Sequence, residues 1–199
     1  MSLNKQAKIL TKSQISSITS YLLGRRNGLR NVVMFQLSVR SGLRAKEISS
    51  MKWSYVLTSN GDIGDVINLP NIASKGNSGR AIPLSKELKK NLESLLSIQS
   101  NKRNFNPHDD HIIISEQRVP MKPNVVVHFF RKLYHSLGLV GCSSHSGRRT
   151  FITNAARMIS TVGGSLEDVR LLAGHSSLNI TSRYIDPNAD AVKKLVNLI

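Results

Sequence analysis

The sequence predicts an α+β fold, a mostly helical domain with a small three-stranded antiparallel sheet. Apolar residues recur at helical spacing before residue 54 and again after residue 84. Between these stretches, short β-like pieces are separated by Gly-containing turns. With 199 residues, 40% of them hydrophobic, the chain is long enough to form one core of ordinary size.

The helices before the sheet are delimited by capping and glycine signals. Residues 11–14 have the spacing of a capping box, and apolar residues then recur at helical intervals until Gly24. A second apolar stretch, residues 32–39, stops before Gly42, and a shorter helix is expected over residues 43–53.

The predicted sheet consists of three short pieces, residues 56–57, 66–69 and 80–83. The separators contain Asn60-Gly61 and the Gly-rich segment 75–79, which are typical of hairpin turns. We therefore expect an antiparallel sheet of about three strands.

Helices are predicted again after the sheet. The first begins at Ser85, the expected N-cap, and others are expected over residues 123–137, 151–159 and 166–173, each followed by glycine within a few residues. A last helix over residues 189–199 would carry an apolar face made of Val192, Leu195, Val196 and Ile199.

The chain is strongly basic, with 28 Lys and Arg residues against 12 Asp and Glu, a net charge of +16 and a pI near 10.5. The excess is uneven, because no acidic residue precedes Glu47. Nucleic acid is the favoured partner, although ribosomal components and membrane-surface binders share this charge. No run approaches the roughly 20 apolar residues of a membrane span, so no membrane partner is expected. The single cysteine, Cys142, cannot form an internal disulfide and fits a reducing cytoplasm.

Residue patterns that bind cofactors are sparse. A phosphate-binding P-loop is absent from the sequence, which argues against ATP dependence. The His-Asp-Asp-His run at residues 108–111 follows Asn106-Pro107 and is better interpreted as a solvated loop than as a metal site. We therefore expect neither a metal nor another cofactor.

Two short basic motifs are candidates for chemistry. Arg44 and Glu47 lie three residues apart, and so do His145 and Arg148 at the start of a predicted helix that Ser144 could cap. The partial positive charge of a helix N-terminus suits a bound phosphate. Taken alone, however, the first pair is better interpreted as a surface ion pair, and His-x-x-Arg is a common spacing.

Lys75 and Tyr184 are equally ambiguous in isolation. Lys75 lies at the tip of the predicted Gly-rich hairpin, where a lysine usually serves solubility, although such a hairpin could also carry it into a DNA groove. Tyr184 follows His175 by nine residues, and a tyrosine in such a position is more often half-buried in a core.

Taken in chain order, these pieces resemble the tyrosine recombinase, or phage integrase, family. Residues 41–48 are similar to its first arginine box, Gly-Leu-Arg with an acid three residues on, and residues 74–84 to its lysine-bearing β-hairpin segment. Residues 145–151 match its His-x-x-Arg box, and residues 172–184 match the closing box that runs from Leu-x-Gly-His to Tyr. Four boxes in this order are far more specific than any one of them.

One departure from the family pattern lies in the His-x-x-Arg box. Gly147 stands where Leu is usual, and Arg149 stands where His is common. We expect Gly147 to weaken a packing contact and the local helix, by up to about 1 kcal/mol relative to Ala. No catalytic group is lost.

The resemblance implies that strands are exchanged at a DNA phosphate without a metal. Tyr184 would attack in line and leave a 3′-phosphotyrosine and a 5′-hydroxyl. Arg44 and Arg148 would clamp the phosphate oxygens, since a guanidinium binds two oxygens at once and keeps its charge. Rejoining would need no ATP, because the phosphotyrosine conserves the energy of the diester.

The same resemblance implies roles for four further residues. Lys75 would protonate the departing 5′-oxygen, and His145 would accept the tyrosine proton or hydrogen-bond the phosphate. His175 would donate to a non-bridging oxygen, and Glu47 would orient its neighbours by hydrogen bonding.

The resemblance therefore predicts site-specific recombination of double-stranded DNA by integration, excision or inversion. The alternatives are a type IB topoisomerase, which relaxes supercoils with a similar set of residues, and a non-catalytic DNA-binding regulator on the same fold. The expected assembly is a homotetramer on paired DNA sites, with a monomer in the absence of DNA as the other possibility. The apolar face of the last helix is consistent with docking on a neighbouring protomer.

We expect residues 1–199 to form one catalytic domain, without the core-binding and arm-binding domains that family members often carry. The chain would then be a trimmed piece of a longer integrase or a naturally short recombinase from a mobile genetic element or phage. Such a protein would act in the cytoplasm of a bacterial or phage-infected cell, on the nucleoid.

Overall fold

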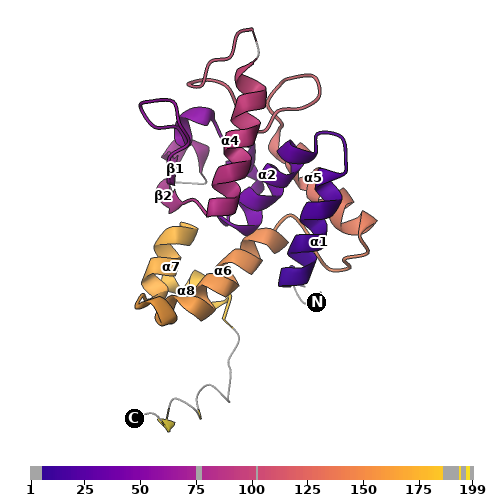
Figure 1. Cartoon of the computed structure of the whole chain (residues 1–199). Coiled ribbons are helices and arrows are strands. Elements are labelled where there is room, and N and C mark those ends of the chain that lie inside the picture. Colours follow the sequence, from indigo (N-terminus) through magenta and orange to yellow (C-terminus); the bar gives the residue numbers. More distant parts are fainter. Residues whose placement is uncertain (1–5, 75–77, 102, 186–192, 194–195, 198–199) are drawn as a thin grey trace.

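The fold is mostly helical with one small sheet, as the sequence predicts (Figure 1). The computed structural model describes residues 6–74, 78–101, 103–185, 193, 196 and 197. In chain order, its regular elements are α1 (Lys12–Leu23), α2 (Gly28–Val39), α3 (Ala45–Ser49), β1 (Val66–Leu69), β2 (Arg80–Pro83), α4 (Lys86–Ser100), α5 (Pro123–Ser136), α6 (Ser146–Met158), α7 (Leu166–Ala173) and α8 (Leu178–Ser182). Single 3-10 turns occur at Trp53–Tyr55, Asn71–Ala73 and Ile159–Val162.

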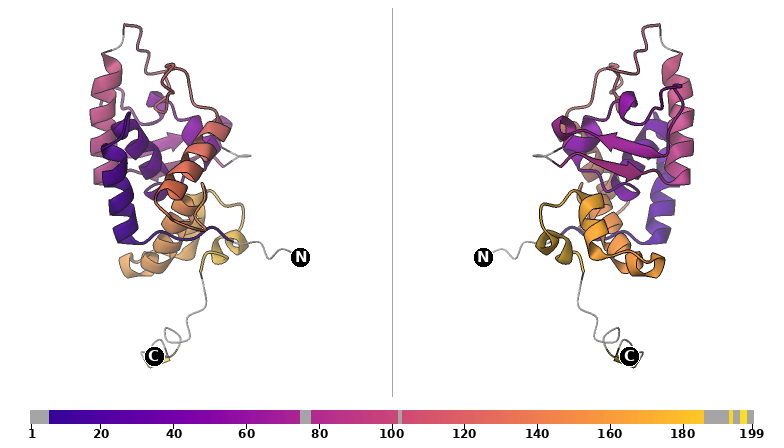
Figure 2. Two further views of the ribbon diagram at one scale, coloured as in Figure 1. Left: turned by 90° about the vertical axis from the view of Figure 1, so that its right-hand side faces the viewer. Right: turned by 90° about the vertical axis from the view of Figure 1, so that its left-hand side faces the viewer.

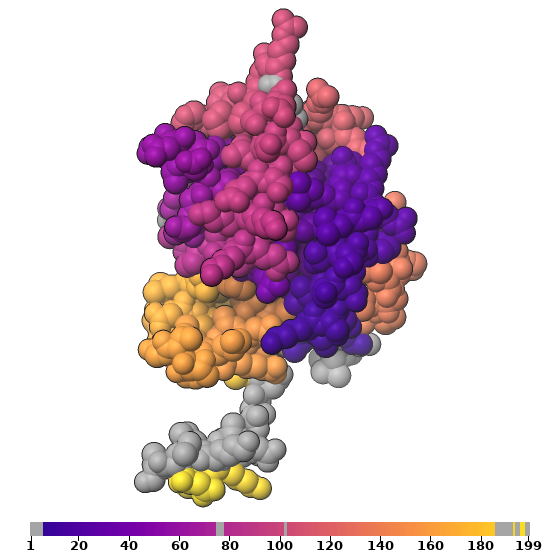
Figure 3. All heavy atoms as spheres, viewed as in Figure 1, coloured from indigo at the N-terminus to yellow at the C-terminus, as the bar shows by residue number. Residues whose placement is uncertain are grey.

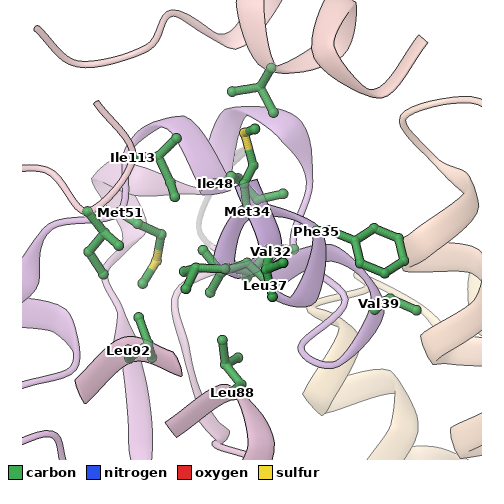
Figure 4. Close-up of a cluster of buried hydrophobic side chains, with 14 of the residues drawn as sticks. Val32, Met34, Phe35, Leu37, Val39, Ile48, Met51, Leu88, Leu92 and Ile113 are labelled. Atoms are coloured by element: carbon green, nitrogen blue, oxygen red, sulfur yellow. The ribbon is translucent and has the colours of Figure 1, made fainter. Parts of the chain in front are cut away.

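Helix α2 is the central helix of the fold. Its residues 31–39 are all buried, and it packs against α1, α3, α4 and α6. A helix that is buried around most of its circumference belongs in the interior of a domain. Figure 4 shows its side chains surrounded by residues of α4 and of the segments that follow α3 and α4, including Met51, Leu88, Leu92 and Ile113.

Local capping signals set two of the helix starts. The Thr11 hydroxyl accepts from the Gln14 N–H, and the Gln14 side chain accepts from the Thr11 N–H, which confirms the capping box of α1. The Ser85 hydroxyl likewise accepts from the Leu88 N–H at the start of α4. The prediction of Ser144 as a cap is wrong, because α6 begins at Ser146 and His145 occupies the N-cap position.

The prediction of three strands is wrong by one strand: among the described residues the sheet is β1 paired antiparallel with β2, with Ile67 opposite Ile82. Residues 56–57 contribute an isolated bridge between Leu57 and Ile63. They follow a 3-10 turn, and the Thr58 N–H donates to the Asp62 carbonyl, so this piece closes a tight local loop instead of joining the sheet.

One helix prediction has different bounds in the structure. The helix expected over residues 43–53 is divided into α3 and the 3-10 turn Trp53–Tyr55. The helix expected to start at His145 and Arg148 and to continue through residues 151–159 is α6 with the 3-10 turn that follows it. The last predicted helix falls largely outside the described residues, including Val192, Leu195 and Ile199, so its apolar face stays a prediction. No helix in the described ranges has the length and apolarity needed to cross a membrane.

Helices α6, α7 and α8 form a layer below the sheet, α2 and α4 in the view of Figure 1. Figures 2 and 3 show the same layer, coloured orange to yellow, from other directions and as a surface. The layer is joined to the core where α6 packs against α2.

Gly147 lies at this contact between α6 and α2. A Cβ on Gly147 would lie 2.3 Å from the Ser38 Oγ and 2.9 Å from the Ser38 Cβ. The expectation that Gly147 weakens packing is therefore wrong, since its missing side chain permits this close approach.

Candidate active site

An open cleft of about 1030 Å³ lies where α6, α7 and α8 meet β2 and the start of α3. Five of the seven predicted site residues line it: Arg44, His145, Arg148, His175 and Tyr184. Glu47 lies beneath this surface, fully buried. Lys75 lies outside the described residues, but Ser78 and Gly79 of the same segment line the cleft.

Glu47 is the buried anion of the site. Its carboxylate accepts hydrogen bonds from the Arg44 backbone N–H at 2.7 Å, from the Arg44 guanidinium at 3.0 Å and from the Arg80 guanidinium at 3.1 Å. Burial alone would raise the pKa of Glu47, but the hydrogen bonds and charge of Arg80, and then of Arg44, outweigh it and lower the pKa. The interpretation as a surface ion pair is wrong, because the Glu47 side chain has no exposed area.

Arg80 is a member of the site to which the sequence had assigned no role. Its side chain is 7% exposed. Besides binding Glu47, its Nε donates to the Leu172 carbonyl at 2.9 Å, so it joins β2 to α3 and α7. Strand periodicity is the signal that could have found it, since Arg80 lies two residues before the buried Ile82 and therefore on the same face.

Arg148 bridges two segments that are distant in the chain. From α6, its guanidinium donates to the Gly42 carbonyl at 2.6 Å and to the Ala173 carbonyl at 2.7 Å. Burial, and then repulsion from Arg44, lower the pKa of Arg148 to about 10, so the group still carries its charge at neutral pH. Two of its five N–H donors are used in these bonds, and the others are available to a ligand in the cleft.

The Gly42 carbonyl reaches Arg148 because of the unusual conformation of its residue. Gly42 has a φ of +66°, in the left-handed region that other residues rarely adopt. A Cβ at this position would also lie 2.5 Å from the ring of Phe151. The Gly-Leu-Arg sequence thus supplies both a cation, Arg44, and a backbone acceptor that holds the second cation.

His145 and Arg148 share the N-terminal turn of α6. His145 is exposed at the N-cap position, and the turn before it is fixed by the Ser143 N–H, which donates to the Ser146 hydroxyl at 3.0 Å. The unpaired N–H groups of a helix N-terminus add partial positive charge here. The geometry thus brings together the two residues that the His-x-x-Arg spacing singles out.

His175 and Tyr184 face one another at the end of the cleft formed by α7 and α8. Their rings are stacked, with centroids 5.4 Å apart and an interplanar angle of 24°. Nδ1 of His175 lies 2.9 Å from the hydroxyl of Thr181. The backbone of Tyr184 is held by the Thr181 carbonyl, which accepts its N–H at 3.0 Å, and by the Thr153 hydroxyl, which donates to its carbonyl at 3.2 Å.

The positive charge of the cleft acts on His175. Burial, followed by the charges of Arg148, Arg44, Arg80 and Arg170, lowers its pKa to about 4. The imidazole is therefore neutral at pH 7 and carries one N–H donor. A phosphate in the cleft would meet fixed guanidinium charges and a neutral histidine donor.

Carboxylate and histidine clusters suited to a metal are not found in the described part of the chain, where no group of three or more His, Cys, Asp or Glu residues could hold an ion. The cleft itself presents hydrogen-bond donors, positive charge and a phenol.

Comparison with known proteins points to one family. The model of the phage integrase family matches residues 8–190. The chain is 25% identical to the tyrosine recombinase XerC of Staphylococcus saprophyticus, an alignment that covers 85% of this chain and 53% of that protein. It is 24% identical to the tyrosine recombinase XerD of Rickettsia conorii, covering 96% of this chain and 63% of that protein.

Solved structures show the same fold. The XerA recombinase superposes with a TM-score of 0.72 at 20% identity, covering 96% of this chain and 62% of that one. The Tn1549 transposon integrase in complex with a circular intermediate DNA superposes with a TM-score of 0.76 at 17% identity, covering 100% and 68%. The chain spans about half the length of the curated relatives it matches.

Proposed function

This chain belongs to the phage integrase family, and we propose that it cuts and rejoins double-stranded DNA through a covalent bond between Tyr184 and a 3′ phosphate. The main support is the convergence of four buried or half-buried arginines, two histidines and one tyrosine on one open cleft. A phosphodiester needs cations around its oxygens and a nucleophile in line with the leaving oxygen, and these groups provide both. The site-specific recombination of DNA is the corresponding activity.

The proposed phosphate clamp consists of Arg44 and Arg148. Each is already held on its protein side, Arg44 by Glu47 and Arg148 by the carbonyls of Gly42 and Ala173. Their remaining N–H donors need little reorganisation to bind the non-bridging oxygens, and the Nε2–H of His175 would add a neutral donor. Such preorganised donors stabilise the charge that develops in the transition state more than that of the ground state.

The proposed transfer starts when the Tyr184 oxygen attacks phosphorus and the bond from phosphorus to the 5′-oxygen breaks. The phenol proton passes to His145, and the departing 5′-oxygen takes a proton from Lys75. Attack by a 5′-hydroxyl on the phosphotyrosine reverses these steps and releases Tyr184. The number of phosphoester bonds stays constant throughout, so rejoining requires no external energy source.

We also propose that residues 1–199 act as the catalytic unit and that two DNA sites are paired in a homotetramer. Exchange between two duplexes breaks four strands, and four copies of one tyrosine are sufficient for this. The reaction would take place in the cytoplasm of a bacterial or phage-infected cell, where the DNA lies.

The test uses a pool of nicked duplexes of random sequence, in which the nick lets the cleaved end diffuse away and traps the adduct. Wild-type protein is expected to form an SDS-resistant adduct, whose sequencing gives the target site. Tyr184→Phe should form none, whereas Tyr55→Phe, a half-buried tyrosine outside the cleft, should react like wild type.

Three outcomes would count against the proposal. An adduct with Tyr184→Phe would overturn the nucleophile, and no adduct with wild type would overturn the chemistry. Relaxation of supercoils without exchange between two marked duplexes carrying the target site would identify a topoisomerase instead.

A further inference from the structure

Thr181 links the ring of His175 to the backbone of Tyr184 in the cleft. It lies in α8, fully buried, and its hydroxyl is 2.9 Å from Nδ1 of His175. Its carbonyl accepts the N–H of Tyr184 at 3.0 Å. One residue therefore contacts the side chain of His175 and the backbone of the proposed nucleophile.

We infer that Thr181 is a positioning residue whose buried hydroxyl donates to Nδ1 of His175 and so keeps the imidazole proton on Nε2, available to the DNA phosphate. This inference rests on the proposed function for the identity of the phosphate. The orientation of the hydroxyl and the tautomer of the ring are properties of the protein without DNA.

The direction of the hydrogen bond follows from the burial of Thr181. Within the described part of the chain, Nδ1 is the one hydrogen-bond partner of this hydroxyl. A buried O–H that left its proton unbound would cost free energy, so the proton points at Nδ1. In a neutral imidazole, a nitrogen that accepts leaves the other as the donor.

The charges around the cleft favour this neutral ring. Arg148, Arg44, Arg80 and Arg170 all disfavour a second proton on His175. A ring with protons on both nitrogens could not accept from Thr181. The geometry and the electrostatics therefore select the same state.

The backbone of His175 is fixed independently, which leaves the ring as the part that Thr181 controls. The His175 N–H donates to the Arg170 carbonyl at 3.1 Å, and the His175 carbonyl accepts from the Arg170 guanidinium at 2.7 Å. A flip of the ring would replace Nδ1 by a carbon beside the Thr181 oxygen and lose the hydrogen bond. The hydroxyl is thus positioned to set both the rotamer and the tautomer.

The first test is nitrogen NMR on the full chain without DNA, with ¹⁵N-labelled histidine and the His175 signals identified by their loss in His175→Gln. Between pH 6 and 8, wild type and Thr181→Ser, which keeps the hydroxyl, should show an unprotonated Nδ1 and a protonated Nε2. In Thr181→Val, which has the same shape without the hydroxyl, both nitrogen shifts should move toward the average of the two tautomers. A proton on Nδ1 in wild type, or an unchanged spectrum in Thr181→Val, would overturn the inference.

The second test is the rate of adduct formation. Thr181→Val should slow it about tenfold, the effect of one lost hydrogen bond, and Thr181→Ser should stay within about threefold of wild type. In the His175→Gln background, Thr181→Val should cause no further loss, because its target is already gone. A further tenfold loss in that background would show a merely structural role.

The two tests separate failure of this inference from failure of the proposed function. If wild type forms no adduct, the proposed function fails, and the spectrum still decides the tautomer. If Thr181→Val does not fold, Thr181→Ala, which also removes the hydroxyl, takes its place in both tests.

Discussion

The apolar core around α2 and the layer formed by α6, α7 and α8 are stabilised in different ways. The core gathers buried side chains from α1 to α5 and from the sheet. The smaller cluster of the second layer has Ile152, Val169 and Ala173 as its fully buried members. In the described structure, much of what fastens α7 to the rest of the protein is polar.

Two arginines provide these polar contacts at the end of α7. Arg80 donates to the Leu172 carbonyl and Arg148 to the Ala173 carbonyl. The last carbonyls of a helix lack intrahelical partners and form its negative end, so cations are well placed there. Cations of the cleft therefore also hold the segment that carries His175 and Tyr184.

The largest effect is expected from Arg148→Gln. The rate of adduct formation should fall by about 10²–10³-fold or more, because a charged phosphate donor is lost. Amide hydrogen exchange in α7 should rise at the same time, because the bond to the Ala173 carbonyl is lost as well. Arg148→Lys keeps the charge but lacks the planar fork whose two nitrogens bind the two carbonyls separately, and it should raise exchange in the same helix.

The contrasting variant is Leu92→Ala, in the core around α2 (Figure 4). Leu92 is fully buried, and its truncation should lower the free energy of unfolding by about 2–5 kcal/mol in urea denaturation. Adduct formation by the folded fraction should keep its wild-type rate. A selective rise of exchange in α7 of this variant, or wild-type exchange in both Arg148 variants, would contradict the distinction between the two regions.

The next effect is a pH dependence of stability that originates in the cleft. The pKa of His175 is about 4 in the folded protein, below its ordinary 6.5, so the unfolded chain binds more protons between these values. The stability that this group contributes is complete above pH 6.5 and is lost as the pH falls toward 4. The loss at pH 5 is about 2 kcal/mol relative to pH 8.

Urea denaturation at several pH values measures this dependence, with His175→Gln as the control. The free energy of unfolding of wild type minus that of His175→Gln should fall by that amount from pH 8 to pH 5. Parallel stability curves over this range would mean that burial and the cations of the cleft do not lower the pKa of His175 as described.

The smallest effect is expected from Gly147→Ala, at the contact between the two regions. Alanine favours the helix by up to about 1 kcal/mol, but its Cβ would overlap Ser38, at a typical cost of about 1–3 kcal/mol. We expect a net loss of roughly 1 kcal/mol in thermal unfolding. Adding Ser38→Ala to Gly147→Ala should recover part of the lost stability. If Gly147→Ala is instead more stable than wild type, the contact between α2 and α6 is not tight.

The residue types of the site could be predicted from the sequence because each box is local. Arg44 with Glu47, and His145 with Arg148, lie on single helical turns, and their spacing survives into the structure. The errors arose where a local pattern was ambiguous. The strand pattern at residues 56–57 competes with a 3-10 turn, and an Arg-Glu spacing does not reveal whether the pair is buried. The role of Lys75 stays a prediction.

The helical periods, the caps at Thr11 and Ser85 and the order of the four boxes follow from the amino-acid sequence, because these depend on neighbours along the chain. The packing of the folded chain was needed to learn that Arg80 shares Glu47 with Arg44, that Arg148 joins Gly42 to Ala173, and that α6 requires a glycine against Ser38. These contacts join residues that are tens of positions apart, and their geometry is set by how the helices pack. Spacing along the chain carries no information about such a fit.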